Sequence, residues 1–239
     1  MNSNPDWLEQ IPQHYRRGLV SALADVSRFV DSDFIIIGAL PLLILGIIDY
    51  QAVWDIDLLF ENQGDVDSFT RKFKYDSMIY DKPMIGSSIT TLRAAFKSCG
   101  VWFNIDLIVK DQVCYQIFSR SAKIYSNLIE YNGPFQMMLP LADPVSILAD
   151  KLTSPRLIRD LKQGNSLSID LRHIFYILNR FQDEEKFYPR LMDDGRSLSQ
   201  VQLVTDNLAA IIKQKEGFGY CDFKPSPRLL AFLNLCSTA

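Results

Sequence analysis

Hydrophobic and polar positions follow different periods in the two parts of the chain. In the first 140 residues, short runs rich in β-branched residues are separated by polar turns, which is the pattern of strands. The clearest runs are residues 34–37, 53–60 and 101–109. From residue 141 onward apolar residues recur every three or four positions, the period of amphipathic helices. The pattern predicts an α/β domain over residues 1–140 and a helical C-terminal domain over residues 141–239.

Helices are also expected among the strands of the first domain. Apolar residues at helical spacing between positions 7 and 30 predict one or two amphipathic helices. After the first strand, Gly38 predicts a tight turn. Pro41 suits the first position of a short helix, where its missing N–H has no partner to lose. The polar residues 61–68 predict a loop that leads into a helix near Phe69.

The second domain carries its own helix signals. Asp143-Pro144 and Ser154-Pro155 each pair a capping residue with a proline suited to the first helical position. They predict two consecutive short helices. Residues 169–181 have a continuous apolar stripe and predict a longer helix, and residues 203–212 predict another.

Three aspartates stand out among the strand residues. Asp55 and Asp57 lie two positions apart in one strand, so their side chains share a face about 7 Å apart. Asp106 lies in the middle of an apolar strand, where a lone carboxylate is unfavourable unless it is paired or binds a metal. If the two strands are neighbours, three carboxylates converge, and such oxygen ligands suit Mg²⁺. The alternative is a solvent-facing strand with two ordinary surface aspartates.

The turn at Gly38-Ala39 joins a strand to a short helix. Backbone N–H groups at such a turn are suited to hold a phosphate group. Glycine has no Cβ and therefore allows a close approach of the ligand.

The order of these motifs resembles the polymerase-beta-like nucleotidyltransferase superfamily. The matching segments are Ile36-Ile37-Gly38-Ala39, Trp54-Asp55-Ile56-Asp57-Leu58 and Asn104-Ile105-Asp106-Leu107-Ile108. Within it the chain looks most like the bacterial abortive-infection and toxin-type nucleotidyltransferases, which carry a downstream Lys and then an Asp. Leu148-Ala149-Asp150-Lys151-Leu152 and Ser168-Ile169-Asp170-Leu171 are similar to these two segments. The resemblance spans about residues 33 to 175 and implies an α+β nucleotidyltransferase fold with a mixed β-sheet and flanking helices.

The resemblance also implies an activity. A nucleoside monophosphate would move from a nucleoside triphosphate to a hydroxyl group, with Mg²⁺ as cofactor and pyrophosphate as leaving group. The acceptor would be a tRNA end, a small molecule or a protein, and a toxin-like enzyme would have a cognate antitoxin or a regulatory partner. The implied metal ligands and catalytic residues are Asp55, Asp57 and Asp106, with Lys151 and Asp170 as further catalytic residues. The implied nucleotide-binding residues are Gly38, Ala39 and Lys151.

A catalytically silent binding or regulatory protein with the same fold is the alternative. Two observations motivate it. Ala39 offers no hydroxyl at the turn, and no basic residue lies between Arg28 and Arg71. Neutralisation of phosphate would then fall to basic residues of the second domain. The candidates there are Lys151, Arg156, Arg159, Lys162 and Arg172. Arg156 and Asp160 also have the i,i+4 spacing of an ordinary pair on a helix surface.

Composition narrows the class of protein further. The 239 residues carry 25 Lys+Arg and 28 Asp+Glu, a net charge of −3. This charge argues against a protein that binds nucleic acid over a large surface and against a polybasic membrane anchor. The four cysteines are scattered, and the chain has only two histidines, His14 and His173. No zinc knuckle or disulfide framework is therefore expected, and the expected location is the reducing cytoplasm. The apolar run 34–48 is too short to span a bilayer, and no membrane partner is expected.

Overall fold

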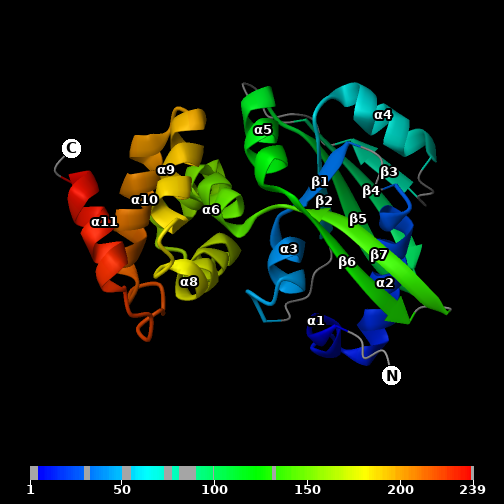
Figure 1. Ribbon diagram of the computed structural model, residues 1–239, viewed down its shortest axis with the longest axis horizontal. Coiled ribbons are helices and arrows are strands. Elements are labelled where there is room, and N and C mark those ends of the chain that lie inside the picture. The colour runs from blue at the N-terminus through cyan, green and yellow to red at the C-terminus, as the bar shows by residue number, and fades with distance from the viewer. Residues whose placement is uncertain are drawn as a thin grey trace. The chain divides into compact units, whose positions relative to one another are not determined.

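The computed structural model describes residues 5–29, 33–49, 55–72, 77–80, 90–98, 100–130 and 133–237. The chain packs as two compact units, Met1–Asp143 and Pro144–Ala239 (Figure 1). The first unit combines a sheet with helices, and the elements of the second are all helices. The α+β class, with a mixed sheet, flanking helices and a helical continuation, is confirmed. The domain boundary was predicted at residue 140, and the first unit ends at residue 143.

The sheet of the first unit has seven described strands in the order β3-β4-β5-β2-β1-β7-β6. Their bounds are β1 Phe34–Ile37, β2 Asp55–Phe60, β3 Ser77–Tyr80, β4 Thr90–Ser98, β5 Val101–Val109, β6 Lys123–Glu130 and β7 Pro134–Leu141. The pairs β2–β5 and β1–β7 are parallel and the others are antiparallel. Val53 and Trp54, with which the second strand was predicted to begin, lie outside the described residues.

Two helices cover one face of this sheet. The helices of the unit are α1 Asp6–Glu9, α2 Gln13–Ser27, α3 Ala39–Ile44, α4 Gln63–Lys72 and α5 Gln112–Ser121. Tyr15 of α2 packs on Phe103 with ring centroids 5.3 Å apart, and Phe69 of α4 packs on Phe60 at 5.5 Å. Side chains alternate between the faces of a strand. Phe60 and Phe103 therefore point away from the face that carries Asp57.

Two local predictions in this unit are wrong. The stretch 61–68 was predicted to be a loop, but α4 begins at Gln63. The Asn62 side chain accepts a hydrogen bond from the Asp65 N–H at 3.2 Å, which caps the helix, and Val66 lies buried one turn later. Pro41 is the third residue of α3 rather than the first. This position is also tolerated, because the first four N–H groups of a helix have no partner within it.

The second unit consists of helices joined by short connections, except for the longer connection 215–226 before the last helix. They are α6 Pro144–Thr153, α7 Pro155–Gln163, α8 Ile169–Phe181, α9 Phe187–Ser197, α10 Val201–Gln214 and α11 Pro227–Ser237. The predicted cap Ser154 accepts a hydrogen bond from the Arg156 N–H at 3.2 Å. Gly164 ends α7 in the left-handed conformation, with φ +64°. Neither α9 nor α11 was predicted from the sequence.

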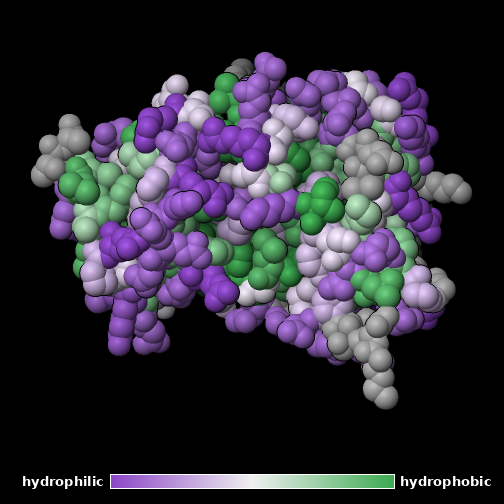
Figure 2. Space-filling model, viewed as in Figure 1, coloured by the Kyte–Doolittle hydropathy of each residue, from purple (hydrophilic) through white to green (hydrophobic). Residues whose placement is uncertain are grey.

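Hydrophobic residues reach the surface at the last helix. Leu235 of α11 is 71% exposed and Leu230 is 46% exposed, and hydrophobic colouring gathers over the position of α11 in Figure 2. Across the part of the chain that the structure describes, no helix combines the length and the apolar character needed to cross a bilayer.

Candidate active site

The pairing of β2 with β5 places the predicted carboxylates on one face of the sheet. In this parallel pair, Asp57 is the backbone partner of Asp106, and Asp55 is the partner of Asn104. Register partners on neighbouring strands point to the same face and lie about 5 Å apart. Asp55, two residues before Asp57, points to that face as well. The Asn104 Nδ2 group donates a hydrogen bond to Asp55 Oδ1 at 3.2 Å, which agrees with this register.

Exposure changes along this face. On β2, Leu59 is buried, Asp57 is half-buried and Asp55 is exposed. On β5, Asp106 is 9% exposed, and Trp102 at the same end as Asp55 is 53% exposed. The carboxylate face therefore opens to its surroundings at the end of the sheet where β2 and β5 begin.

Gly38 brings the backbone of the turn after β1 against Asp57. Ile37, the last residue of β1, is the backbone partner of Asp57, and Gly38 follows with φ +76°. A Cβ atom at Gly38 would overlap the Asp57 Oδ2 atom and would lie 3.1 Å from its Cγ. Both the backbone conformation and this close approach require glycine. Ala39 is the first residue of α3, directly after the turn.

The carboxylates are oxygen ligands of the kind that Mg²⁺ prefers. Over the described part of the chain, no three His, Cys, Asp or Glu side chains are grouped closely enough to hold a metal ion. Mg²⁺, however, usually takes only one or two protein carboxylates and completes its coordination with water and substrate phosphates. Asp57 and Asp106, on adjacent strands and with the same orientation, fit this mode of binding.

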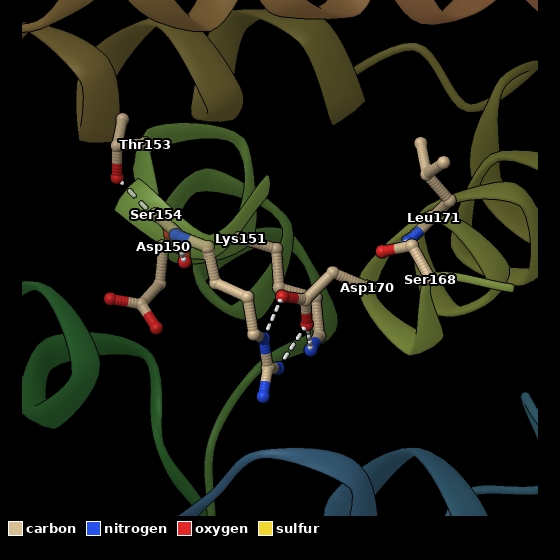
Figure 3. A network of polar contacts seen from close by, with 8 residues as sticks. Asp150, Lys151, Thr153, Ser154, Ser168, Asp170 and Leu171 are labelled. Carbon is tan, nitrogen blue, oxygen red and sulfur yellow. Dashed lines mark hydrogen bonds and ion pairs between the residues drawn. The ribbon is translucent and has the colours of Figure 1, made fainter. Parts of the chain in front are cut away.

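A second cluster of charged residues lies in the second unit (Figure 3). Asp170, near the start of α8, is buried with 1% of its side chain exposed. Its Oδ1 atom accepts hydrogen bonds from Lys151 Nζ of α6 at 2.6 Å and from Arg156 Nη2 of α7 at 2.7 Å. Its Oδ2 atom accepts one from Arg156 Nε at 2.6 Å. Two cations from two different helices therefore share one carboxylate.

The two cations fix the charge states within this cluster. Burial by itself raises the pKa of Asp170, but the hydrogen bonds from Arg156 and the charge of Lys151 outweigh burial and hold that pKa well below its ordinary value. His173, one turn further along α8, is 2% exposed. Burial and then the charge of Lys151 lower the pKa of His173 to about 3. His173 is therefore neutral at physiological pH. Its Nδ1 atom has no hydrogen-bond partner.

The predicted site residues thus fall into two groups. Asp55, Asp57, Asp106, Gly38 and Ala39 lie together in the first unit. Lys151 and Asp170 lie together in the second. His173 is buried beside the second group.

Sequence reasoning missed two contacts. Arg156, for which the i,i+4 spacing suggested Asp160, binds Asp170, and Arg159 lies 3.9 Å from Asp160. Asn104, which binds Asp55, was not singled out, although it precedes Asp106 by two positions on the same face. That two-residue spacing could have indicated that Asn104 shares the face of Asp106. Nothing in the local sequence indicates the contact of Arg156.

Comparison with known proteins gives similar solved structures, among them the following two. One is described as a "putative nucleotidyltransferase from H. pylori", with 14% identity and a TM-score of 0.42 over 95% of this chain and 96% of that chain. The other is JHP933 from Helicobacter pylori, with 13% identity and a TM-score of 0.39 over 89% of this chain and 99% of that chain. No family model and no curated protein matches the chain. Similarity this low leaves the case for an activity to the residues themselves.

Proposed function

We propose that the chain is a Mg²⁺-dependent nucleotidyltransferase of the polymerase-beta-like type. One observation carries the proposal. The backbone pairing of Asp57 with Asp106 gives two carboxylates on adjacent strands of one sheet face, with Asp55 on the same face and the Gly38 turn against Asp57. This combination of acidic side chains and a close-approaching backbone suits a metal-bound polyphosphate.

In the proposed reaction, the acceptor hydroxyl attacks the α-phosphorus of a nucleoside triphosphate. A new phosphorus–oxygen bond forms, the bond to the β-phosphate oxygen breaks, and pyrophosphate leaves. Mg²⁺, when bound, neutralises charge on the phosphates and on the attacking and leaving oxygens. Asp57 and Asp106 would hold the metal, and Asp55 would lie at the open end of the same face. Asp106 would also accept the proton of the hydroxyl.

The turn would bind the phosphates through its backbone. Gly38 lies directly beside Asp57, and Ala39 follows it as the first residue of α3. Backbone N–H groups are donors that need no side chain, so a hydroxyl at position 39 is not required for this role. In the second unit, Lys151 would neutralise phosphate charge while Asp170 holds its amine. Because Asp170 is shared with Arg156, the three side chains together keep a net positive charge.

The proposed acceptor is a hydroxyl group of a tRNA end, a small molecule or a protein. A toxin-like role with a cognate antitoxin or other regulatory partner goes with the abortive-infection type of enzyme. Transfer would take place in the cytoplasm, where nucleoside triphosphates, Mg²⁺ and all three acceptors occur together.

The test is label transfer from each of the four α-³²P nucleoside triphosphates to total RNA and to cell lysate, with Mg²⁺ present. We expect transfer by the unchanged protein and none by Asp57→Asn. The matched control is Asp67→Asn. Asp67 is an exposed residue of α4, and its carboxylate accepts a hydrogen bond from the Gln63 side chain on the helix surface. Its transfer should equal that of the unchanged protein. If Asp57→Asn transfers as much label as the unchanged protein, Asp57 takes no part in the reaction.

A silent binding protein gives a different result. It would show no transfer with any acceptor but would be stabilised against heating by a nucleotide with Mg²⁺. A ligand at 100 times its Kd adds about 2.7 kcal/mol to the free energy of unfolding. If the protein shows no transfer and is not stabilised by any nucleotide, both the enzyme and the silent binding protein are contradicted.

A further inference from the structure

One row of residues crosses the sheet through the carboxylates. Successive backbone partners on β3, β4, β5, β2 and β1 are Ile79, Arg93, Asp106, Asp57 and Ile37. Gly38 follows Ile37 in the turn. Adjacent strands are about 5 Å apart. Arg93 therefore occupies the position next to Asp106, on the side away from Asp57.

Charge is distributed unevenly among the described strands. β1, β2 and β5, which carry the carboxylates and lead into the glycine turn, contain no Lys or Arg. The basic residues of the described strands are Arg93 and Lys97 of β4 and Lys123 of β6. Lys97 is the partner of Trp102, and Lys123 is the partner of Leu141. Arg93 is thus the basic residue that the register places in the row of Asp57 and Asp106.

Two acids at neighbouring positions of adjacent strands repel each other, and a base on the next strand offsets this repulsion. A triphosphate bound at the same place would bring further negative charge. An arginine suits both situations, because its guanidinium stays charged at every relevant pH and can donate two parallel hydrogen bonds to a phosphate.

We propose that Arg93 is a substrate-binding residue of the carboxylate site and takes the polyphosphate of the nucleotide beside Asp106. The inference rests on the proposed function and adds to it a cation within the first unit. The segment before Asp55 lacks a basic residue, and Arg93 supplies the charge from another strand. Phosphate neutralisation then does not depend on the second unit alone.

The test measures binding of inorganic tripolyphosphate with Mg²⁺ to the whole chain by isothermal titration calorimetry. Arg93→Gln should weaken the Kd about tenfold to a hundredfold, the range expected for loss of a hydrogen bond from a charged donor. Arg93→Lys should weaken it less, because the charge stays but the paired donors are lost. Lys97→Gln, on the same strand but outside the row, should leave the Kd within about twofold.

A purely structural role of Arg93 predicts different Kd values for tripolyphosphate. If Arg93 only offsets the charge of Asp106, adding Arg93→Gln to Asp106→Asn leaves the Kd of Asp106→Asn unchanged. This result would overturn the proposal. Equal weakening by Arg93→Gln and Lys97→Gln would also overturn it, because it would report the general charge of the surface. Should Arg93→Gln fail to fold, as judged by circular dichroism, a Kd for Arg93→Lys equal to that of the unchanged protein would count against the proposal.

Failure of this inference differs from failure of the proposed function. If nucleotide transfer requires Asp57 but proceeds equally well in Arg93→Gln, the role of Arg93 is contradicted and the proposed activity is supported. If tripolyphosphate binding requires Arg93 but the protein transfers no nucleotide, the role of Arg93 is supported and the proposed activity is contradicted. Absence of tripolyphosphate binding by the unchanged protein would overturn the role of Arg93 whatever the transfer assay gives.

Discussion

Lys151 Nζ lies 2.6 Å from Asp170 Oδ1, and both side chains are at least nine-tenths buried. Arg156 binds the same carboxylate through two of its nitrogen atoms. A buried carboxylate with two cationic partners is favourable only as a complete group, because removal of the carboxylate leaves positive charge without compensation inside the unit. This relationship has consequences for stability that are separate from any role in binding phosphate.

Asp170→Asn should destabilise the second unit by about 3 to 5 kcal/mol at neutral pH, since Lys151 would keep a buried charge without its partner. The measurement is urea unfolding followed by circular dichroism. Asp193→Asn, which removes a surface pair with Arg196, is the control and should change stability by less than about 1 kcal/mol. A similar small effect of Asp170→Asn would show that the cluster contributes little to the fold.

The same variant has a defined pH dependence. The pKa of Asp170 in the folded chain is lowered from its ordinary value of 3.8. The carboxylate therefore contributes its full stabilisation above about pH 5 and loses it as the pH falls below the ordinary value. The difference in unfolding free energy between the unchanged protein and Asp170→Asn should be constant from about pH 8 to pH 5 and should shrink below pH 4. A difference that already shrinks at pH 6 would contradict this account.

His173 should make the protein less stable as the pH falls through a higher range. Its pKa is about 3 in the folded chain against 6.5 ordinarily, so between these values the unfolded chain binds a proton that the folded chain does not. Stability then falls by up to about 1.4 kcal/mol per pH unit as the pH decreases. His173→Leu should flatten the profile between pH 6.5 and pH 4.5. A profile that stays equally steep in His173→Leu would contradict this account.

Strands and helices with a strong apolar period were predicted closely. The strand 101–109 and the helix 169–181 have the predicted bounds. The start of α4 was missed because its first turn is polar, and only Val66 and Phe69 mark its buried side. α9 and α11 were not predicted, although their apolar residues are packed or partly packed in the folded unit. Local polarity concealed the start of α4 and also α9, because tertiary packing, rather than composition, decides such segments. It does not explain α11, which is rich in leucine.

The site was predictable in part for a similar reason. The shared face of Asp55 and Asp57 follows from the two-residue period of a strand. The alignment of Asp57 with Asp106 does not, because the register of two strands far apart in sequence depends on the packing of the whole sheet. The position of Arg93 beside Asp106 depends on that register as well. The contact of Arg156 with Asp170 joins the first turns of two helices, and local spacing favoured Asp160 instead.

Asp57→Asn should leave the fold intact or make it more stable when no metal is bound. Asp57 and Asp106 are neighbouring acids, and neutralising one relieves their repulsion. In the presence of EDTA, the melting temperature of Asp57→Asn should equal or exceed that of the unchanged protein. Mg²⁺ should raise the melting temperature of the unchanged protein and of Asp67→Asn, and should raise that of Asp57→Asn less. A large loss of stability in EDTA would instead identify Asp57 as a structural residue.

Gly38→Ala should be more destabilising than Gly46→Ala, although both glycines have positive φ values of +76° and +65°. A positive φ is unfavourable for a residue with a Cβ at both positions, and it costs more at Gly38, because φ +76° with ψ −140° is a conformation essentially restricted to glycine. Around Gly46 no atom lies within 4 Å of the added Cβ, whereas at Gly38 the added Cβ overlaps the Asp57 carboxylate. The excess loss of unfolding free energy in Gly38→Ala over Gly46→Ala therefore combines the backbone conformation with this contact. The excess should become smaller when both substitutions are compared in an Asp57→Ala background, where the carboxylate is absent, and the decrease measures the contact. An excess that is unchanged in that background would mean that the turn itself, and not its approach to Asp57, requires glycine at position 38.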